Sequence, residues 1–301
     1  YSLLLTIPYL ILWHHQELGR QDICRPISPG LLRLQIGVII ATDISNTPAF
    51  SQLDIAPTIA SILGLELPEK DGRAIEAVAG WGCKKAALII VDSRGYDLLI
   101  HLLPHMANMN LLSQDGLLLP AKAVSNRTTP AIASILSGLL PEHHQILDKA
   151  GAKESSILSL PEIAASAGEV CAVIMEQNGA EVYQGLIQKV YGIKDSLPPH
   201  EFDQEACRLT CQALLDRPDL LVSYFIGIDK NAHLGSDLKG IREAALLIDR
   251  CIGRIMAMAD EDTLLVICGD HPIHAGRLKR VNEPYCVAMI LARGRRRWPE
   301  E

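Results

Sequence analysis

Three short apolar runs in this 301-residue chain each lead into an aspartate, and this recurrence limits the folds open to it. The runs cover residues 87–91, 221–228 and 264–269, and they are followed by Asp92, by Asp229 and by Asp270. Short apolar stretches rich in β-branched residues are typical of strands that are buried on both faces of a parallel sheet. Ligands of open α/β sheets bind just beyond the carboxyl ends of the strands. The pattern therefore predicts three acidic side chains gathered at one end of one sheet.

From residue 84 onward, strand-like patterns alternate with helical ones, which is typical of βαβ units. Helices are expected over 98–112, 131–140, 159–167, 181–190, 205–215 and 241–258, and further strands over 170–175 and 287–292. The region before residue 84 is less regular, with a strand expected over 37–41, a helix over 54–65 and a polar turn over 67–72. We therefore predict an α/β fold of three layers, α/β/α, around a mostly parallel central sheet.

Composition restricts the class of partner and the compartment. A formal charge of −7 and a pI near 5.8 argue against general nucleic-acid binding, which needs a basic surface. The apolar stretch from Tyr1 to Trp13 is too short to span a membrane and lacks the basic start of a signal peptide. Cysteines occur mostly inside apolar segments, and no pair has zinc-ribbon spacing, so a reduced, cytoplasmic compartment is expected. Neither nucleic acid nor a membrane is an expected partner.

Histidines accompany two of the three aspartates. His233 follows Asp229 by four residues, and His271 and His274 follow Asp270 closely. The side chains of adjacent residues diverge, so Asp270 and His271 are suited to two different ions. Mixed carboxylate and imidazole ligands suit Zn²⁺ best, with Mn²⁺ and Fe²⁺ as alternatives. The candidate ligands are too many for one tetrahedral ion and sufficient for two: Asp92, Asp229, His233, Asp270, His271 and His274.

The segment from Ser125 to Pro130 offers a hydroxyl nucleophile in a turn ahead of a helix. Free backbone N–H groups and the helix dipole favour an anion at such a helix start. Metal coordination lowers the pKa of a hydroxyl, which then ionises to an alkoxide at neutral pH. Thr128 and Thr129 are the candidate residues.

Taken in order, these motifs resemble the alkaline phosphatase superfamily, in particular its type I phosphodiesterase/nucleotide pyrophosphatase branch. That branch has a strand ending in Asp, then a T-x-P turn leading into S-x-x-[TS]-G-x-x-P-x-x-H-G, then D-x-x-x-H, then D-H-G. The corresponding segments here begin at Asp92, Thr128, Asp229 and Asp270, with Pro272 in place of the last glycine. Each motif alone is weak, but four in order at strand ends are specific.

The resemblance covers most of residues 84–294 and implies a role for each candidate. One ion would be held by Asp229, His233 and His274, and the other by Asp92, Asp270 and His271, with the Thr128 oxygen as a further ligand. The T-x-P spacing selects Thr128 as the nucleophile and leaves Thr129 in reserve. The family's asparagine after the T-x-P proline is Ala131 here, so the non-bridging phosphate oxygen would be bound instead by Asn126, Arg127 or Lys230.

The order of the segments departs from that of the family. Residues 51–73 resemble the segment that normally closes this fold, yet here they precede the first strand. One interpretation is a circularly permuted single domain over residues 1–301. Residues 1–80 would then be equivalent to the family's C-terminal segment, and residues 84–294 would form the metal and nucleophile core. Permutation is tolerated where the termini lie close together. The other interpretation is a fragment that spans two tandem copies; we favour the permuted domain.

The expected activity is metal-dependent hydrolysis of a small phosphorylated substrate, as a phosphodiesterase or a phosphomonoesterase. Thr128 would attack phosphorus, and water would cleave the resulting phosphothreonine intermediate. Sulfatase activity is disfavoured because the sequence has no C-x-P-x-R segment from which a formylglycine could form. Two alternatives remain open: a phosphoglycerate mutase-like phosphotransferase, and a non-catalytic, metal-stabilised binding domain. The sequence predicts neither the substrate nor the oligomeric state.

Overall fold

The computed structural model describes residues 49–279 and 286–295. Within these ranges eight strands form one sheet, in the order β1-β3-β8-β7-β2-β6-β4-β5. The strands are β1 (Phe50–Ser51), β2 (Lys85–Val91), β3 (Leu117–Lys122), β4 (Cys171–Glu176), β5 (Lys189–Ile193), β6 (Leu220–Phe225), β7 (Thr263–Gly269) and β8 (Cys286–Arg293). Strand β8 is antiparallel to both of its neighbours, and the other described pairs are parallel. The predicted mostly parallel sheet is therefore confirmed.

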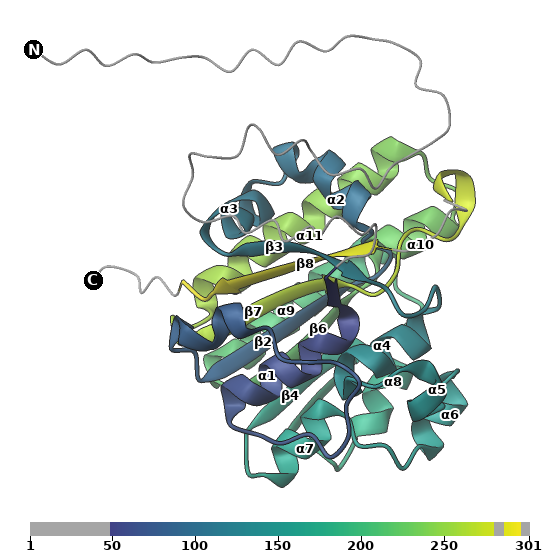
Figure 1. Cartoon of the computed structure of the whole chain (residues 1–301). Helices are drawn as coiled ribbons and strands as arrows, with labels where there is room; N and C mark the ends of the chain where they lie inside the picture. Colours follow the sequence, from purple (N-terminus) through teal and green to yellow (C-terminus); the bar gives the residue numbers. More distant parts are fainter. Residues whose placement is uncertain (1–48, 280–285, 296–301) are drawn as a thin grey trace, which may run out of the picture.

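Helices cover both faces of this sheet (Figure 1). One face carries α2 (Tyr96–Leu102), α3 (Ala107–Asp115), α9 (Pro199–Leu215) and α11 (Leu238–Met258). The other face carries α1 (Ile55–Leu63) and α7 (Leu160–Ser166), and α4 (Thr128–Ser137) packs against both of these helices. Shorter helices are α5 (Pro141–His144), α6 (Lys149–Glu154), α8 (Gln177–Ala180) and α10 (Gly227–His233). The predicted α/β/α layering is confirmed.

The three central strands end at the same level. Every residue of β6 and β7 is buried, and in β2 only the first residue is partly exposed, as the continuous apolar runs predict. Val91 at the end of β2 pairs with Phe225 of β6 on one side and with Gly269 of β7 on the other. This register brings the residues that follow the three strands to one place.

Some stretches of the chain differ from the local predictions. Residues 117–122, for which no element was predicted, form β3 beside the short strand β1, where Pro120 is tolerated because a strand near the sheet edge can spare an N–H donor. The helix expected over 181–190 is a single 3-10 turn followed by strand β5, since Gly185 adopts a φ of 82° between them. The strand before Asp229 ends at Phe225, and Asp229 lies inside α10.

The segment before β2 packs into the same core. Strand β1 adds to the sheet beside β3, and α1 contacts β2 and β7. Gly72 lies so close to this segment that a Cβ there would be 2.0 Å from the carbonyl oxygen of Leu53. The strand expected over 37–41 and the apolar stretch from Tyr1 to Trp13 lie outside the described residues. Circular permutation, as the explanation of this order, stays a prediction.

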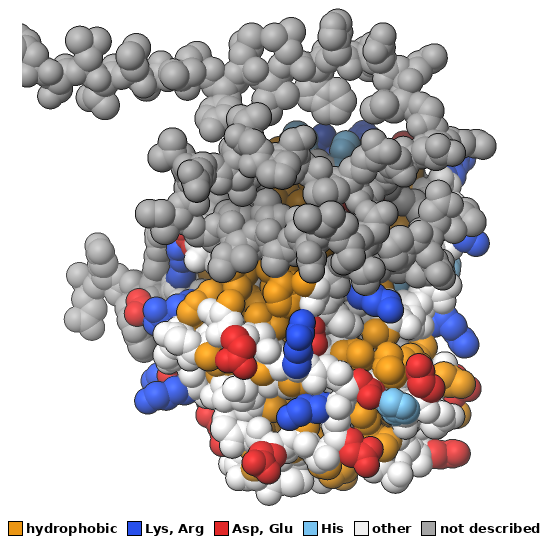
Figure 2. Space-filling model, viewed as in Figure 1, with side chains coloured by type: hydrophobic (Ala, Val, Ile, Leu, Met, Phe, Trp, Pro, Cys, Tyr) orange, Lys and Arg blue, Asp and Glu red, His pale blue; other side chains and the backbone are white. Residues whose placement is uncertain are grey.

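The visible surface carries mixed charge. On the face shown in Figure 2, the basic and acidic side chains of the described residues are interspersed among apolar ones. Within the described ranges, none of the helices has both the length and the apolar character needed to cross a bilayer.

Candidate metal centre and active site

The first group of candidate ligands is a buried triad. Asp92 follows β2, and Asp270 and His271 follow β7; their ligand atoms all lie within 4.8 Å of one another. His271 Nε2 is 3.4 Å from Asp92 Oδ1 and 3.4 Å from Asp270 Oδ2. Both of these carboxylate oxygens are buried without a hydrogen-bond partner among the described residues. Buried charges of this kind are costly unless they are paired, and a mixed oxygen and nitrogen donor set fits a cation such as Zn²⁺.

Hydrogen bonds to the other oxygen of each carboxylate fix the triad. Tyr224, a buried residue of β6, donates its hydroxyl to Asp92 Oδ2. The backbone N–H groups of Ser93 and His271 donate to Asp270 Oδ1 at 3.0 Å and 2.8 Å. The other oxygen of each carboxylate, Asp92 Oδ1 or Asp270 Oδ2, is therefore available to a cation and lies near His271 Nε2. Outer contacts of this kind orient the ligands of metal sites.

A second triad, more open to solvent, is formed by Asp229, His233 and His274, whose ligand atoms also lie within 4.8 Å of one another. His233 Nε2 lies 3.5 Å from Asp229 Oδ1 and 3.3 Å from His274 Nε2. The Asp229 side chain is buried, whereas those of His233 and His274 are 49% and 30% exposed. The six predicted ligands are thus brought together as two groups of three; their binding of metal stays a prediction.

Ser93 connects the two triads. Its N–H donates to Asp270 Oδ1, and its hydroxyl donates to Asp229 Oδ1 at 2.8 Å. The backbone φ of Ser93 is 59°, in the left-handed region that residues other than glycine seldom adopt. Strained backbone of this kind persists where the surroundings fix it, and it concentrates at functional sites.

Burial and mutual repulsion raise the pKa of the buried carboxyl groups. For Asp92 burial is the largest cause, and the nearby charges of Asp270 and Asp229 raise its pKa further. Burial also raises the pKa of Asp270. Carboxylates placed this close together resist joint ionisation unless a cation lies between them. Divalent metal binding to this site should therefore release protons.

Thr128 faces the buried triad from the first turn of α4. Its Oγ1 lies 3.2 Å from His271 Nε2. The His271 ring is held because Nδ1 lies 3.0 Å from the carbonyl oxygen of Pro272 and donates to it, which leaves Nε2 facing the threonine. Thr129, the reserve candidate, lines the same cavity as Thr128.

The three predicted phosphate-binding residues occupy different surroundings. Lys230, in α10, lines a cavity of about 300 Å³ together with Thr128. Asn126 and Arg127 are exposed just before α4 and do not belong to the described lining of that cavity. Ala131, at the position of the family's asparagine, is fully buried. The structure thus places one of the three candidates at the cavity.

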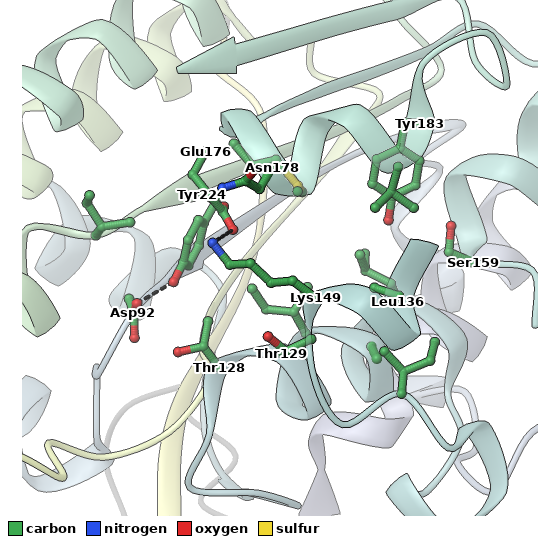
Figure 3. A pocket seen from close by; sticks show the side chains of 18 of the residues that line it. Asp92, Thr128, Thr129, Leu136, Lys149, Ser159, Glu176, Asn178, Tyr183 and Tyr224 are labelled. Atoms are coloured by element: carbon green, nitrogen blue, oxygen red, sulfur yellow. Dashed lines mark hydrogen bonds and ion pairs between the residues drawn. The ribbon is translucent and has the colours of Figure 1, made fainter. Parts of the chain in front are cut away.

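Sequence reasoning missed the charged residues Lys149 and Glu176 of this cavity. Lys149, the first residue of α6, lies between Thr128 and Glu176 in Figure 3. Its Nζ is 3.5 Å from Oε1 of Glu176, the last residue of β4. No motif spacing connects either residue to the ligands, so only the folded chain reveals them.

Gln52, also missed, ties the segment before β2 to the site. Its buried side chain donates from Nε2 to the carbonyl oxygens of Gly269 and Asp270 at 2.8 Å and 2.6 Å. Its Oε1 accepts the N–H of Val124 at 3.0 Å. Val124 lies in the loop that leads to Thr128, so one side chain fixes the ligand-bearing loop and the threonine-bearing loop together.

We expect Gln52→Leu, which keeps the volume and removes the hydrogen bonds, to lower kcat by about tenfold or more, because small misplacements of reacting groups are costly. The free energy of unfolding should fall by about 1–3 kcal/mol, since buried backbone groups lose their partners. Steady-state kinetics and urea unfolding measure the two effects. Gln114→Leu is the control, because the Gln114 side chain lies on the exposed surface, where it donates to Asn110 Oδ1 at 3.2 Å. A Gln52→Leu protein with wild-type kcat would contradict this positioning role.

Asp203 shapes the start of α10. Its Oδ1 accepts the N–H groups of Ile226 and Gly227 at 2.9 Å and 3.2 Å. Glycine is required at 227, because a Cβ there would lie 2.2 Å from Asp203 Oδ2. Burial raises the pKa of Asp203 to about 7 in spite of these two bonds. The two bonds lie between the end of β6 and the start of α10, the helix that carries Asp229 and His233 of the second triad.

We expect Asp203→Asn to remove a pH-dependent part of the stability. A carboxyl group whose pKa is raised by folding binds more protons in the folded state, so its contribution falls as pH rises from about 4 to about 7. The fall is at most about 4 kcal/mol, since one pKa unit corresponds to ~1.4 kcal/mol. Urea unfolding in the presence of chelator, at several pH values, measures the difference in unfolding free energy between wild type and variant. A difference that does not decrease with rising pH would contradict this assignment.

Comparison with known proteins supports the fold and shows a resemblance to one family over part of the chain. The sequence pattern of the type I phosphodiesterase / nucleotide pyrophosphatase family matches residues 175–288. GPI ethanolamine phosphate transferase 3 of Schizosaccharomyces pombe is 37% identical over 54 residues, which are 18% of this chain and 6% of that protein. Phosphonoacetate hydrolase from Sinorhizobium meliloti 1021 has a TM-score of 0.52 at 13% identity, over 62% of this chain and 56% of that one. A 2-O GAG sulfatase has a TM-score of 0.53 at 11% identity, over 69% and 64%.

These likenesses show that the fold is alkaline phosphatase-like. The predicted resemblance to the type I phosphodiesterase/nucleotide pyrophosphatase branch of that superfamily is confirmed. The matched stretch includes the second triad and the Asp270-His271 pair, whereas Asp92 and Thr128 precede it. The chain spans just over half the length of the phosphonoacetate hydrolase and a small part of the transferase.

Proposed function

We propose that this protein is a metal-dependent hydrolase of phosphoric esters, with a threonine nucleophile and two divalent metal ions. The observation that carries the proposal is the pair of adjacent triads with Thr128 Oγ1 at 3.2 Å from His271 Nε2. Phosphoryl-transfer enzymes with two metals hold them about 4 Å apart. Zn²⁺ is the proposed metal because each triad mixes imidazole nitrogen with carboxylate oxygen; Mn²⁺ and Fe²⁺ are the alternatives.

The proposed reaction proceeds in two displacements at phosphorus. Divalent ions held by the triads would neutralise phosphate charge and lower the pKa of the threonine hydroxyl. Thr128 Oγ1 forms a bond to phosphorus as the bond to the leaving alcohol breaks, and the alcohol takes up a proton. Water then cleaves the phosphothreonine, which restores the hydroxyl and releases the phosphate product. The free N–H groups at the start of α4 favour the anionic phosphate.

Lys149 and Lys230 would bind the non-bridging phosphate oxygens. Both line the cavity beside Thr128. The Lys149 ammonium has three donors, so it can keep its contact with Glu176 and donate to a phosphate oxygen at the same time. Asn126 and Arg127 are less favoured candidates because they are exposed outside the described lining of the cavity.

The competing functions are less well supported. A non-catalytic, metal-stabilised binding domain would not need a hydroxyl placed against His271. A phosphoglycerate mutase-like phosphotransferase would use a serine in other surroundings. The proposed cytoplasmic location rests on the cysteine pattern of the sequence alone.

Assays of the metal-loaded protein test the proposal. The protein, supplied with Zn²⁺ or Mn²⁺, is assayed with p-nitrophenyl phosphate, with bis(p-nitrophenyl) phosphate and with a phosphonate ester. We expect nitrophenolate release that chelator abolishes and added metal restores. No turnover of any of the three, by protein of verified ion content, would contradict a hydrolase and favour the binding domain.

A further inference from the structure

We infer that the cavity beside Thr128 receives a substrate ester group that carries a hydrogen-bond donor, and that Glu176 selects this group. The inference rests on the proposed function, because the ester group is attached to a phosphorus atom that Thr128 would attack. The inference specifies which class of alcohol is esterified to the phosphate of the substrate.

The cavity extends well beyond the candidate nucleophile (Figure 3). Its volume of about 300 Å³ is at the lower end of the range typical of ligand pockets. Thr128 and Asp92 lie on one side of the view, and Tyr183 and Ser159 lie on the opposite side. Much of the wall is apolar, formed by Ile132, Leu136, Ile146, Ile157, Met175 and Val182. The cavity therefore has room for an alkyl group attached to the phosphate.

Glu176 is a cavity residue with incomplete hydrogen bonding. Its Oε1 pairs with Lys149 Nζ, while its Oε2 is buried without a hydrogen-bond partner among the described residues. Two other acidic residues of the lining, Glu162 and Asp195, each accept a side-chain hydrogen bond. A buried acceptor that lacks a partner costs free energy, so a ligand that donates to Glu176 Oε2 is favoured.

The backbone limits where this carboxylate can go. Glu176 ends β4, and the next residue begins α8. Within α8, a Cβ on Gly179 would lie 3.2 Å from Glu176 Cδ and 2.8 Å from Met175 Sδ. The helix therefore passes directly against the carboxyl group. The Glu176 side chain is 16% exposed, whereas that of Lys149 is 53% exposed, so the carboxylate is the buried partner of the pair.

The same charges disfavour a second phosphate in the cavity. Apart from the triads, the lining carries the carboxylates of Glu162, Glu176 and Asp195 and the ammonium groups of Lys149 and Lys230. An anionic extension of the substrate would meet this acidic wall, and repulsion of this kind is a means of specificity. An ammonium or a hydroxyl would donate to Glu176 Oε2 instead. These two donors share the required chemistry, and matched probes distinguish them.

The test compares three alkyl phosphates of similar size: 2-aminoethyl phosphate, 2-hydroxyethyl phosphate and propyl phosphate. Calorimetry gives the Kd of each for zinc-loaded Thr128→Ala protein, which should bind them without turnover. We expect at least one donor-bearing phosphate to bind about tenfold more tightly than propyl phosphate, because a hydrogen bond to a charged group is strong. Tighter binding of the amine alone identifies an ammonium, and equal tightening identifies any donor. Equal affinity for all three probes would overturn the inference.

Variants of Glu176 separate this role from a general effect on the fold. Glu176→Leu should remove the preference for a donor, and Glu176→Gln should keep the preference for the hydroxyl while weakening that for the ammonium. Glu181→Leu is the matched control, because Glu181 pairs with Lys153 at 2.8 Å and is not part of the described cavity lining. A donor preference that survives Glu176→Leu overturns the inference. Failure of the proposed function would show separately, as absence of hydrolysis by the wild-type protein.

Discussion

Replacement of Thr128 by alanine should reduce kcat for the best phosphoric ester by about three orders of magnitude or more. The hydroxyl lies 3.2 Å from His271 Nε2 at the start of α4, and its loss removes the nucleophile of the proposed reaction. The bound metal should remain, because the three side chains of each triad are unchanged. Steady-state kinetics and elemental analysis of the same preparations measure both quantities.

Thr129→Ala is the matched control. Thr129 is the second residue of α4 and lines the same cavity, but the N-cap position is Arg127, so the loss of the Thr129 hydroxyl should leave kcat and stability close to those of wild type. An inactive Thr129→Ala beside an active Thr128→Ala would mean that the nucleophile is the neighbouring threonine. Activity in both variants would mean that water attacks phosphorus directly, without a phosphothreonine.

Asp270→Asn should be nearly as damaging, with a fall in kcat of about three orders of magnitude. Asp270 Oδ2 is buried, has no hydrogen-bond partner among the described residues and lies 3.4 Å from His271 Nε2. The amide keeps the shape and removes the negative charge, so the buried triad should hold a cation much more weakly. Zinc should then raise the Tm of the variant less than that of wild type, because bound ligand stabilises the folded state.

Asp216→Asn is the control for this second prediction. Asp216 is an exposed carboxylate that pairs with Lys189 at the surface, away from both triads. Kinetics and thermal unfolding with and without zinc compare the two variants. Wild-type kcat and a wild-type zinc-dependent Tm shift in Asp270→Asn would contradict a role for this carboxylate in metal binding.

The strands that carry the candidate ligands could be predicted because their signal is local. The runs before Asp92 and Asp270 are continuous and apolar, as expected for strands buried on both faces, and parallel register aligns their ends. Prediction failed where the local signal was weak or mixed. Strand β3 contains a proline, and β5 is short, lies at the sheet edge and is not continuously buried.

The side chains that support the site could not be predicted, because their contacts join distant parts of the chain. Gln52 contacts Gly269 across 217 positions, and Tyr224 contacts Asp92 across 132. The ion pair between Lys149 and Glu176 joins the first residue of α6 to the last residue of β4. A sequence motif indicates which residues have the required chemistry. Which of these side chains contact one another depends on the tertiary fold.

The zinc content of three proteins tests most directly whether this is a two-ion centre. Wild type, Asp270→Asn and His233→Ala are loaded with zinc under identical conditions, freed of excess metal and measured by elemental analysis. Two adjacent triads predict two ions per chain in wild type and one in each variant, because each substitution disables one triad. Fewer than one ion per chain in wild type, or two ions retained in both variants, would contradict the two-ion centre.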